Sequence, residues 1–576
     1  MRQILYNCSI DNMEEMALFV KITPRKKNGK TYYYAELAEA YRENGKVKHR
    51  RISYFGSVDK ETAEKLKIVY SKDFDSFTNL NKVEFPSAVP YGSFYLIDSI
   101  FEYLNMFPTF KDSFVSNDNH ISVPTALKCI KSMIFQRIIQ PDSKLALTEW
   151  LDGTSISHFL GEGKTEHDLQ TIYRSLEVLT DNFPLVEQSL YTWAQSLFQQ
   201  NMQELYYDIT SSYFEGHKCI LAEFGYSRDH RKDREQLVIG LVTTPDGFPI
   251  KCSIYPGSTA DKTTVSDIIK EIKANYPIKE FIFVGDRGML SKKNLDAILK
   301  EKQQYIMAIP RAWTKKYLKN IDIDENQMLE IQKNLFIRFL PPVEGQRFLL
   351  CLNTEKRTDD TEFRNQSIKD ISEKLNELNA SLIKGKQKRL KTKEDVMKKV
   401  GGILKSKKAG KYFKVNTKDD SNCPLGFLLE YTTDEAKIES DKRLDGTFVI
   451  QTNNPDFEGE KLVKVYKNLN AVETAFRIIK NDIDIRPMYH WKEERVKGHI
   501  YICVLAYFVT IAIEYIAQGK KVNKSACKIL NELNKIGLIE IALPNGDKKF
   551  ALTKINKEQQ SYLNAFGIKK MKIPSV

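Results

Sequence analysis

Two aspartates stand in apolar segments where an unpaired carboxylate would be costly. Asp208 lies within "YYDITSSYF", whose aromatic and β-branched residues are typical of a buried strand. Asp286 follows the apolar run of "FIFVGDRGML", at the carboxyl end of a second strand. If these strands are neighbours, the two carboxylates converge and repel each other unless a divalent cation lies between them. Hard carboxylate oxygens in such an arrangement favour Mg²⁺ or Mn²⁺.

A third acid is expected from a helix packed beside the sheet, and Glu473 is the best match. Within "VKVYKNLNAVETAFRIIKNDIDI", helical spacing places Glu473 on a mostly apolar face together with Tyr466, Leu469, Phe476 and Lys480. An acid on that face is costly unless it coordinates something. Each acid taken alone is equally compatible with a turn, a cap or an ordinary surface position. The three together predict a metal-binding site.

The elements that must position these acids are strands and helices between residues 201 and 310. Strand patterns occur at 205–214, 236–244, 248–256, 280–285 and 304–310. Helical patterns fall at about 261–275 and 291–302, the second with Ser291 as N-cap. The order β-β-β-α-β-α-β predicts a mixed sheet with helices packed on it.

The regions before this core are predicted to be β-rich and then helical. Residues 17–57 read as two β-hairpins with Asn-Gly turns at 28–29 and 44–45. Basic residues around both turns, interleaved with tyrosines at 32–34, indicate either a DNA-contacting sheet or a solvated surface. Residues 91–200 follow a helical period, and Pro141-Asp142-Ser143 begins a helix near Lys144.

Residues 311–453 interrupt the core with β-like pieces and a charged helical stretch. Within that stretch Ile368, Ile371, Leu375, Leu378 and Leu382 form a short coiled-coil-like seam. Residues 384–414 hold thirteen lysines or arginines and two acids, nearly the whole net charge of +13. Such a run is often a solvated face, but its concentration in one insertion favours a polyanion-binding arm.

Composition and cysteine usage restrict the class of protein. The chain has 576 residues, 42% of them hydrophobic, and is long enough for several domains. Its sequence pI of about 9.0 favours nucleic acid over a membrane as partner. The eight cysteines are scattered without a CxxC pair, so no zinc site is expected. The start of the chain lacks the features of a signal peptide, and the apolar run 500–516 is short for a membrane span, which predicts a buried helix at about 497–518.

With these motifs the chain resembles the bacterial insertion-sequence DDE transposases, whose catalytic core is RNase H-like. The branch with a β-rich insertion between the second Asp and the Glu carries the motif Y-x2-R-x3-E-x6-K. This chain has Tyr466, Glu473 and Lys480 at those spacings, with Leu469 in place of the arginine and Arg477 as a possible substitute. Further similar stretches are "QPDSKLALTEW", "GYSRDHR", "PGSTADKTT", "GDRG" and "RVKGHI".

The resemblance implies a fold and a chemistry. The fold is an α/β, RNase H-like mixed sheet flanked by helices, interrupted by a β-rich insertion with a helical arm, and preceded by β-hairpin and helical DNA-binding regions. Asp208, Asp286 and Glu473 would hold two Mg²⁺ or Mn²⁺ ions that activate a water or a 3′-hydroxyl for in-line attack on DNA. Residues implied to contact DNA are Lys480, Arg287, Arg231, Tyr466, His499, Lys388 and Arg389. Trp313 or Phe448 would offer a platform for a flipped base.

The expected domains are a β-hairpin region at 1–90, a helical DNA-binding region at 91–200, and a first core part at 201–310. An insertion at 311–453, a second core part at 454–518 and a carboxyl-terminal region at 519–576 follow, the last with a short helix and a strand pair that turns at 545–546. The expected partners are the terminal inverted repeats of the element, target DNA and a second copy of the chain, in the bacterial cytoplasm on the nucleoid. The alternatives are an RNase H-like nuclease or resolvase without strand transfer, and a non-catalytic transposase-derived DNA-binding protein.

Overall fold

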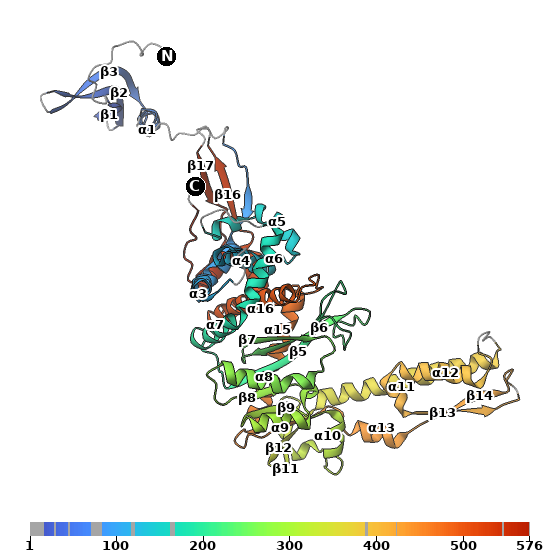
Figure 1. Ribbon diagram of the computed structural model, residues 1–576. Coiled ribbons are helices and arrows are strands. Elements are labelled where there is room, and N and C mark those ends of the chain that lie inside the picture. Colours follow the sequence, from blue (N-terminus) through green and yellow to red (C-terminus); the bar gives the residue numbers. More distant parts are fainter. Residues whose placement is uncertain are drawn as a thin grey trace. The chain divides into compact units, whose positions relative to one another are not determined.

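The computed structural model describes residues 17–27, 30–43, 46–70, 83–116, 121–161, 168–385, 390–421, 423–543 and 547–574. The chain divides into two compact units. One comprises residues 1–89, 537–555 and 572–576, and the other comprises residues 90–536 and 556–571. Figure 1 shows the elements of both.

A nine-stranded mixed sheet forms the centre of the larger unit, in the order β10-β11-β12-β15-β9-β8-β5-β6-β7. β5 pairs antiparallel with β6 and parallel with β8, β6 pairs antiparallel with β7, and β8 pairs parallel with β9. These five strands and the helices between them confirm the predicted β-β-β-α-β-α-β order. Their bounds are β5 (Glu204–Tyr213), β6 (Gln236–Thr243), β7 (Pro249–Pro256), β8 (Ile282–Gly285) and β9 (Gln304–Ala308).

Helices cover both faces of this five-stranded part (Figure 1). Successive residues of a strand face opposite sides, so Tyr207 lies against Thr264 of α8 whereas the Tyr206 hydroxyl lies beside Asn468, between α14 and α15. Gly240 of β6 gives Tyr207 its room, since a Cβ there would lie 2.6 Å from the tyrosine hydroxyl. The helices are α8 (Asp261–Asn275), α9 (Lys292–Lys300), α14 (Gly459–Lys467), α15 (Asn470–Asn481) and α16 (Glu493–Gly519).

The remaining four strands extend the same sheet. β15 pairs antiparallel with β9, and β12, β11 and β10 follow outward. The β-like pieces that the sequence placed at 334–353 and at the end of 424–452 therefore continue the core sheet, whereas residues 427–433 pair with 413–419 in a separate two-stranded sheet. Their bounds are β10 (Leu329–Gln332), β11 (Leu335–Val343), β12 (Gln346–Asn353) and β15 (Thr447–Thr452), and α10 (Arg311–Tyr317) follows β9.

Between β12 and β15 the chain forms an arm, residues 354–442, with a hydrophobic core of its own. The seam residues Ile371, Leu375, Leu378 and Leu382 are buried against Val396 and Val400 of α12 and against Phe413, Phe427 and Leu429 of a β-hairpin. The predicted seam thus packs within the chain. The arm contains α11 (Thr354–Ile383), α12 (Lys393–Lys405), β13 (Phe413–Asp419), β14 (Phe427–Thr433) and α13 (Glu435–Lys442), seen beside one another in Figure 1.

Helices from the amino-terminal and the carboxyl-terminal parts of the larger unit pack around α16. Among the described residues α16 is the one helix long and apolar enough to cross a membrane, but 67% of its most apolar stretch is buried inside the protein. It packs on α4 and α6, which confirms the predicted buried helix. The other helices are α2 (Gly92–Leu104), α3 (Met106–Ser113), α4 (Val123–Ile139), α5 (Lys144–Asp152), α6 (Leu169–Asp181), α7 (Phe183–Ser196), α17 (Ala526–Leu533) and α18 (Lys557–Ala565).

The smaller unit contains two three-stranded sheets. One is the antiparallel sheet of β1 (Ala17–Lys27), β2 (Lys30–Glu43) and β3 (Lys46–Val58), followed by α1 (Lys60–Val69). The other has the order β17-β16-β4, from β4 (Ala88–Pro90), β16 (Gly537–Ala542) and β17 (Lys548–Leu552). The predicted strands are confirmed, while the predicted turns at 28–29, 44–45 and 545–546 lie outside the described residues.

Candidate active site

Asp208 and Asp286 lie at the same edge of the sheet. β5 and β8 are parallel neighbours whose last paired residues are Tyr207 and Gly285, so each aspartate is the next residue along its strand. Asp208 is still within β5, whereas Asp286 begins the short 3-10 helix η4 (Arg287–Met289). The sequence predicted that the carboxylates converge if the strands are neighbours, and the strands are neighbours.

Glu473 comes from the helix that covers this part of the sheet. α15 packs on β5 and β6, and Glu473 stands in its first turn, where the amino end of the helix dipole favours a carboxylate. The sequence predicted one continuous helix carrying Tyr466 and Glu473 on one face. The helix is instead interrupted at Asn468 and Leu469, so Tyr466 belongs to α14.

The three carboxylates are coupled electrostatically. The pKa of Asp208 is raised to about 7, first by burial and also by the negative charges of Asp286 and Glu473, against a lowering by the backbone of Ile209 and by Arg228. Burial and the charge of Asp286 also raise the pKa of Glu473. Carboxylates that raise one another's pKa share a site without enough compensating positive charge.

Arg228 is a residue of this site that the sequence reasoning did not identify. Its guanidinium lowers the pKa of Asp208 and donates to Asp261 Oδ2 at 2.7 Å, while its backbone N–H donates to Ser211 Oγ at 3.0 Å. From the stretch "GYSRDHR" the sequence predicts Arg231 as a DNA contact. Only the tertiary fold shows which of its arginines faces the acids.

Close backbone packing holds the loop that carries Arg228. A Cβ on Gly225 would lie 2.0 Å from the carbonyl oxygen of Gly257, and a Cβ on Gly257 would lie 2.0 Å from that of Gln236. Only glycine fits at either position. The stretches "GYSRDHR" and "PGSTADKTT" therefore pack directly on each other beside the amino end of α8.

Arg287 and Tyr466 also lie beside the acids. Arg287 Nε is 3.8 Å from Asp286 Oδ1, and its side chain is 63% exposed. Burial and the charges of Asp286 and Glu473 raise the pKa of Tyr466, whereas Arg287 lowers it. Both residues therefore belong to the neighbourhood that the sequence assigned to them.

Lys480 and Arg231 are occupied by protein carboxylates. Lys480 Nζ donates to Asp229 Oδ1 at 2.8 Å, and Arg486 binds the same oxygen. Arg231 pairs with Asp233 at 2.8 Å and lies over the ring of Tyr213. A DNA phosphate would have to compete with these partners for either cation.

His499 is inside the protein rather than on a DNA-facing surface. Its side chain is buried, its Nε2 donates to the carbonyl oxygen of Ile485 at 3.1 Å, and burial holds its pKa well below the usual range. A neutral buried imidazole cannot contact a phosphate on the surface. Lys388 and Arg389 lie outside the described residues.

Leu469, which replaces the arginine of the Y-x2-R-x3-E-x6-K motif, is buried at the junction of α14 and α15. An arginine there would have to extend out of an apolar environment. The guanidiniums that do act on the acids are Arg228 on Asp208 and Arg287 beside Asp286.

The carboxylates of the three acids are chemically suited to bind a divalent cation. Within the described part of the chain, no three His, Cys, Asp or Glu side chains stand close enough together, as they are, to enclose a metal ion. Asp208, Asp286 and Glu473 nevertheless supply hard oxygen donors whose mutual repulsion a divalent cation would offset.

A basic pocket leads from the acids to the base of the arm. One pocket of about 440 Å³ is lined by Arg287 and Tyr466 at the acid side, by Phe448, and by Arg311 and Lys356 at the arm side. Phe448 stacks near Tyr466 with ring centroids 6.2 Å apart. Trp313, the other aromatic residue considered for a base platform, does not line this pocket.

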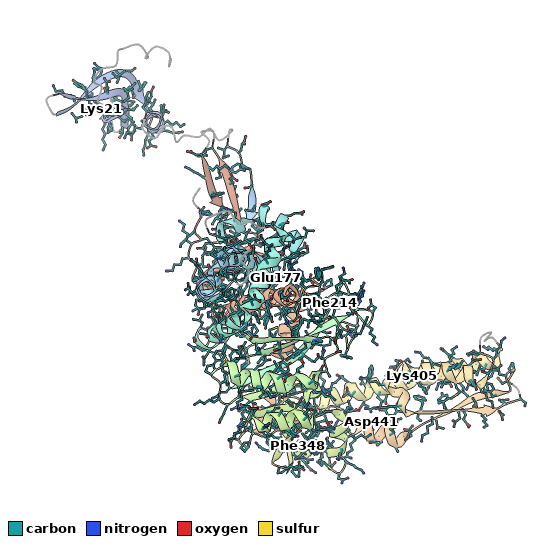
Figure 2. The ribbon with its side chains drawn as sticks, viewed as in Figure 1. Lys21, Glu177, Phe214, Phe348, Lys405 and Asp441 are labelled. Atoms are coloured by element: carbon teal, nitrogen blue, oxygen red, sulfur yellow. The ribbon has the colours of Figure 1, made fainter. Side chains whose placement is uncertain are left out.

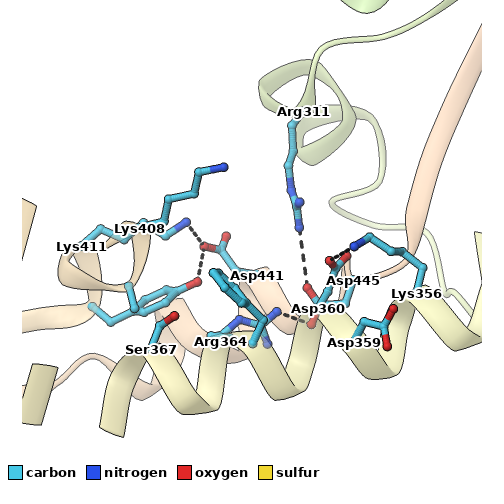
Figure 3. A pocket seen from close by; sticks show the side chains of 13 residues that line it. Arg311, Lys356, Asp359, Asp360, Arg364, Ser367, Lys408, Lys411, Asp441 and Asp445 are labelled. Atoms are coloured by element: carbon cyan, nitrogen blue, oxygen red, sulfur yellow. Dashed lines mark hydrogen bonds and ion pairs between the residues drawn. The ribbon is translucent and has the colours of Figure 1, made fainter. Parts of the chain in front are cut away.

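A second pocket of about 600 Å³ adjoins it and shares Arg311, Lys356 and Asp360. Figure 3 shows Arg311 reaching toward Asp445, which also binds Arg364, while Lys411 pairs with Asp441. The buried pair of Arg364 and Asp445 therefore ties the arm to the loop before β15, and Arg311 of α10 pairs with the same aspartate.

Comparison with known families agrees with this geometry. A model described as "Transposase DDE domain" matches residues 203–509, more than half of the chain. A model described as "IS1634 family transposase, N-terminal domain" matches residues 20–75. No curated protein matches the chain. The chain therefore belongs to the DDE transposases of insertion sequences, a family of DNA transposases that use divalent metal ions.

Proposed function

We propose that this transposase binds the ends of its own insertion sequence and catalyses both DNA cleavage and strand transfer, in a cut-and-paste pathway. The observation that carries the proposal is the coupling of Asp208, Asp286 and Glu473 at the end of two parallel strands under α15. It fits the family of the chain and leaves no need for another catalytic group.

The three acids would hold two Mg²⁺ or Mn²⁺ ions, which supply Lewis-acid activation of the attacking and leaving oxygens. The residues of the chain have distinct tasks. Asp208 must give up its proton, and Arg228 favours its ionised form. β5 and β8 fix the two aspartates, whereas Glu473 on α15 closes the site from the facing helix.

The path of the DNA is proposed from exposed cations. Lys398, Lys399 and Lys405 of α12 are exposed and have no ion pair among the described residues, and Lys405 is labelled in Figure 2. The pocket lined by Arg287 and Phe448 would receive the strand next to the cut, with Phe448 as the aromatic platform. The β1-β2-β3 sheet would add further contacts to the DNA.

Two copies of the chain are expected to act together, because two ends of one element must be joined. The partners are the terminal inverted repeats and a target duplex, and the cell compartment is the bacterial cytoplasm, on the nucleoid. Strand transfer distinguishes this function from that of an RNase H-like nuclease, which would cut without joining.

The test is a reaction with labelled element ends, target plasmid and Mg²⁺. Asp208→Asn, Asp286→Asn and Glu473→Gln should each lower cleavage and joining by at least about a thousandfold, since each removes an oxygen donor. Binding to the ends should persist. The matched control is Asp296→Asn, an exposed aspartate on α9, which should react like the wild type.

Retained cleavage in any of the three variants would contradict the assignment of that residue. Cleavage without joining in the wild type would favour the plain nuclease. End binding without any cleavage would favour a non-catalytic DNA-binding protein.

A further inference from the structure

A pocket of about 410 Å³ outside the acid site is lined by several basic side chains. It lies where the amino end of α5 meets the segment between α15 and α16. The basic groups lining it are Arg137, Lys144, Arg486, His490 and His499. Two exposed apolar or aromatic residues, Leu145 and Tyr489, also line it.

Lys144 is the unusual member of this pocket. It is only 4% exposed, and its Nζ has no hydrogen-bond partner among the described residues. Burial and the nearby Arg137 together lower its pKa well below the usual range. A lysine is almost never buried without a partner, because the ammonium loses its hydration without compensation.

Among the other basic groups of the pocket, only Arg486 forms an ion pair with a carboxylate within the described residues. Arg137 donates to the backbone carbonyls of Asp142, at 2.6 Å, and Asp484, at 2.9 Å, and its buried Nε has no partner among the residues that the structure describes. Arg486 pairs with Asp229. His490 and His499 are kept neutral, first by burial and then by the charge of Lys144.

Two carboxylates line the pocket, but neither is joined to Lys144 by an ion pair within the described residues. Asp142 Oδ1 accepts from the backbone N–H of Ser143 at 2.6 Å. Burial raises the pKa of Asp484, whereas the charges of Arg137 and Arg486 lower it. The buried ammonium therefore faces a pocket whose own acids are directed elsewhere.

We propose that this pocket binds a phosphate group, held by Lys144 and the amino end of α5, with Arg486 at its side. α5 has nine residues, and Ser143 caps it by accepting from the N–H of Ala146 at 3.0 Å. Its positive dipole end adds to the ammonium charge. A phosphate supplies the three or more acceptor oxygens that such a set of donors can satisfy.

The phosphate can come from the DNA backbone or from free phosphate, and only the first source rests on the proposed function. Arg486 connects the pocket to the acid site, because Asp229 binds both Arg486 and Lys480 and follows Arg228 in the chain. The exposed ring of Tyr489, which lines the pocket, offers a stacking surface for nucleotides.

The experiment measures thermal unfolding of the full chain in phosphate-free buffer and during titration with inorganic phosphate, at constant ionic strength. In the wild type, saturating phosphate should raise Tm by about 3 °C or more. Lys144→Met and Lys144→Gln should lose this shift. Without phosphate their Tm should equal or exceed that of the wild type, because the uncompensated buried charge is gone.

The matched control is Lys131→Met, in α4 of the same helical region. Lys131 is also largely buried, but its Nζ is paired with Asp98 at 2.5 Å and with the carbonyl oxygen of Phe159 at 2.6 Å. This variant should have a lower Tm than the wild type yet keep the phosphate-induced shift. The control separates loss of a lysine from loss of the pocket.

A second arm measures binding of the element ends in the same buffer. If the phosphate belongs to DNA, Lys144→Met should weaken binding about tenfold and reduce the salt slope by about one. If the phosphate is free, DNA binding should be unchanged while the phosphate-induced shift is lost.

The proposal is overturned if the phosphate-induced shift and DNA binding are both unchanged in Lys144→Met. It is also overturned if both Lys144 variants are unfolded or much less stable than the wild type without phosphate, since the lysine would then be stabilised by the protein alone. Failure of the wild type to bind its ends would contradict the proposed function, while the phosphate titration would still decide on the pocket.

Discussion

The carboxyl group of Asp208 is held where its neutral form is favoured. Its pKa is raised from 3.8 to about 7, first by burial, so the folded protein keeps a proton that the unfolded chain releases above about pH 4. The cost of this carboxyl to the folded state therefore grows as the pH rises from about 4 to about 7 and is constant above that. Each pKa unit corresponds to about 1.4 kcal/mol.

Asp208→Asn should therefore stabilise the metal-free protein at pH 8, with a gain that shrinks as the pH falls toward 4. The physical reason is that the amide never carries the buried charge. Thermal unfolding between pH 4 and pH 8 measures the effect, with Asp296→Asn as the surface control. A lower Tm of Asp208→Asn at pH 8 would mean that this carboxylate is stabilised in the metal-free fold.

Arg228 should set the pH dependence of metal binding. Arg228→Met removes a cation that lowers the pKa of Asp208, so protonation should compete with Mg²⁺ up to a higher pH. Mg²⁺-induced stabilisation, measured from pH 6 to pH 9, should shift its midpoint upward by about half a unit or more. Arg228→Lys should keep the midpoint close to that of the wild type, and an unchanged midpoint in Arg228→Met would show that Arg228 acts only in the structure.

The sequence predicted the positions of some residues of the site but not the contacts that they make. Asp208 and Asp286 could be identified because a carboxylate in an apolar strand is unusual. Lys480 could be placed near the acids but not paired with Asp229, which lies 251 positions earlier in the chain. The burial of His499 and the part played by Arg228 likewise depend on long-range packing, which no local pattern contains.

At the scale of elements, local patterns predicted the core strands closely. The predicted strand at 205–214 is Glu204–Tyr213, and the predicted helix at about 261–275 is Asp261–Asn275. Local patterns also indicated the strand-like pieces at 334–353, but they did not indicate the sheet to which these strands belong. They join the core sheet through β15, and pairing between distant strands is not fixed by periodicity.

The arm gives a prediction at this scale. Lys398, Lys399 and Lys405 lie on α12, whose other face is buried in the core of the arm. Changing all three to Gln should weaken binding of the element ends and lower the salt slope by up to about three, because each phosphate contact contributes about 0.9. Binding isotherms at several salt concentrations measure the slope.

The control for the arm changes Lys293, Lys300 and Lys302 to Gln. Lys293 and Lys300 belong to α9, and Lys302 follows it in the chain. These lysines are exposed and carry the same charge, but they lie outside the arm. They should leave the slope unchanged. An equal loss in both triple variants would mean that only total charge matters.

At the scale of the whole molecule, one chain offers one set of three acids, whereas transposition joins two element ends. We therefore expect the active complex to contain two chains of 66.7 kDa and two DNA ends. Light scattering of the purified complex, with ends of known mass, measures this ratio. A complex of one chain with one end that carries out strand transfer would contradict the expectation.

The separation of the acids along the chain affects when activity can arise during synthesis. Ribosomes add about 5–20 residues per second, so the arm and the outer strands delay Glu473 by at least several seconds after Asp286. A gene copy interrupted within this interval would encode the β1-β2-β3 sheet, whose contacts are all local, and both aspartates, but neither α15 nor α16. If the β1-β2-β3 sheet contacts the element ends, as we propose, such a product would occupy those ends without cutting them, and damaged copies of the element would restrain intact ones.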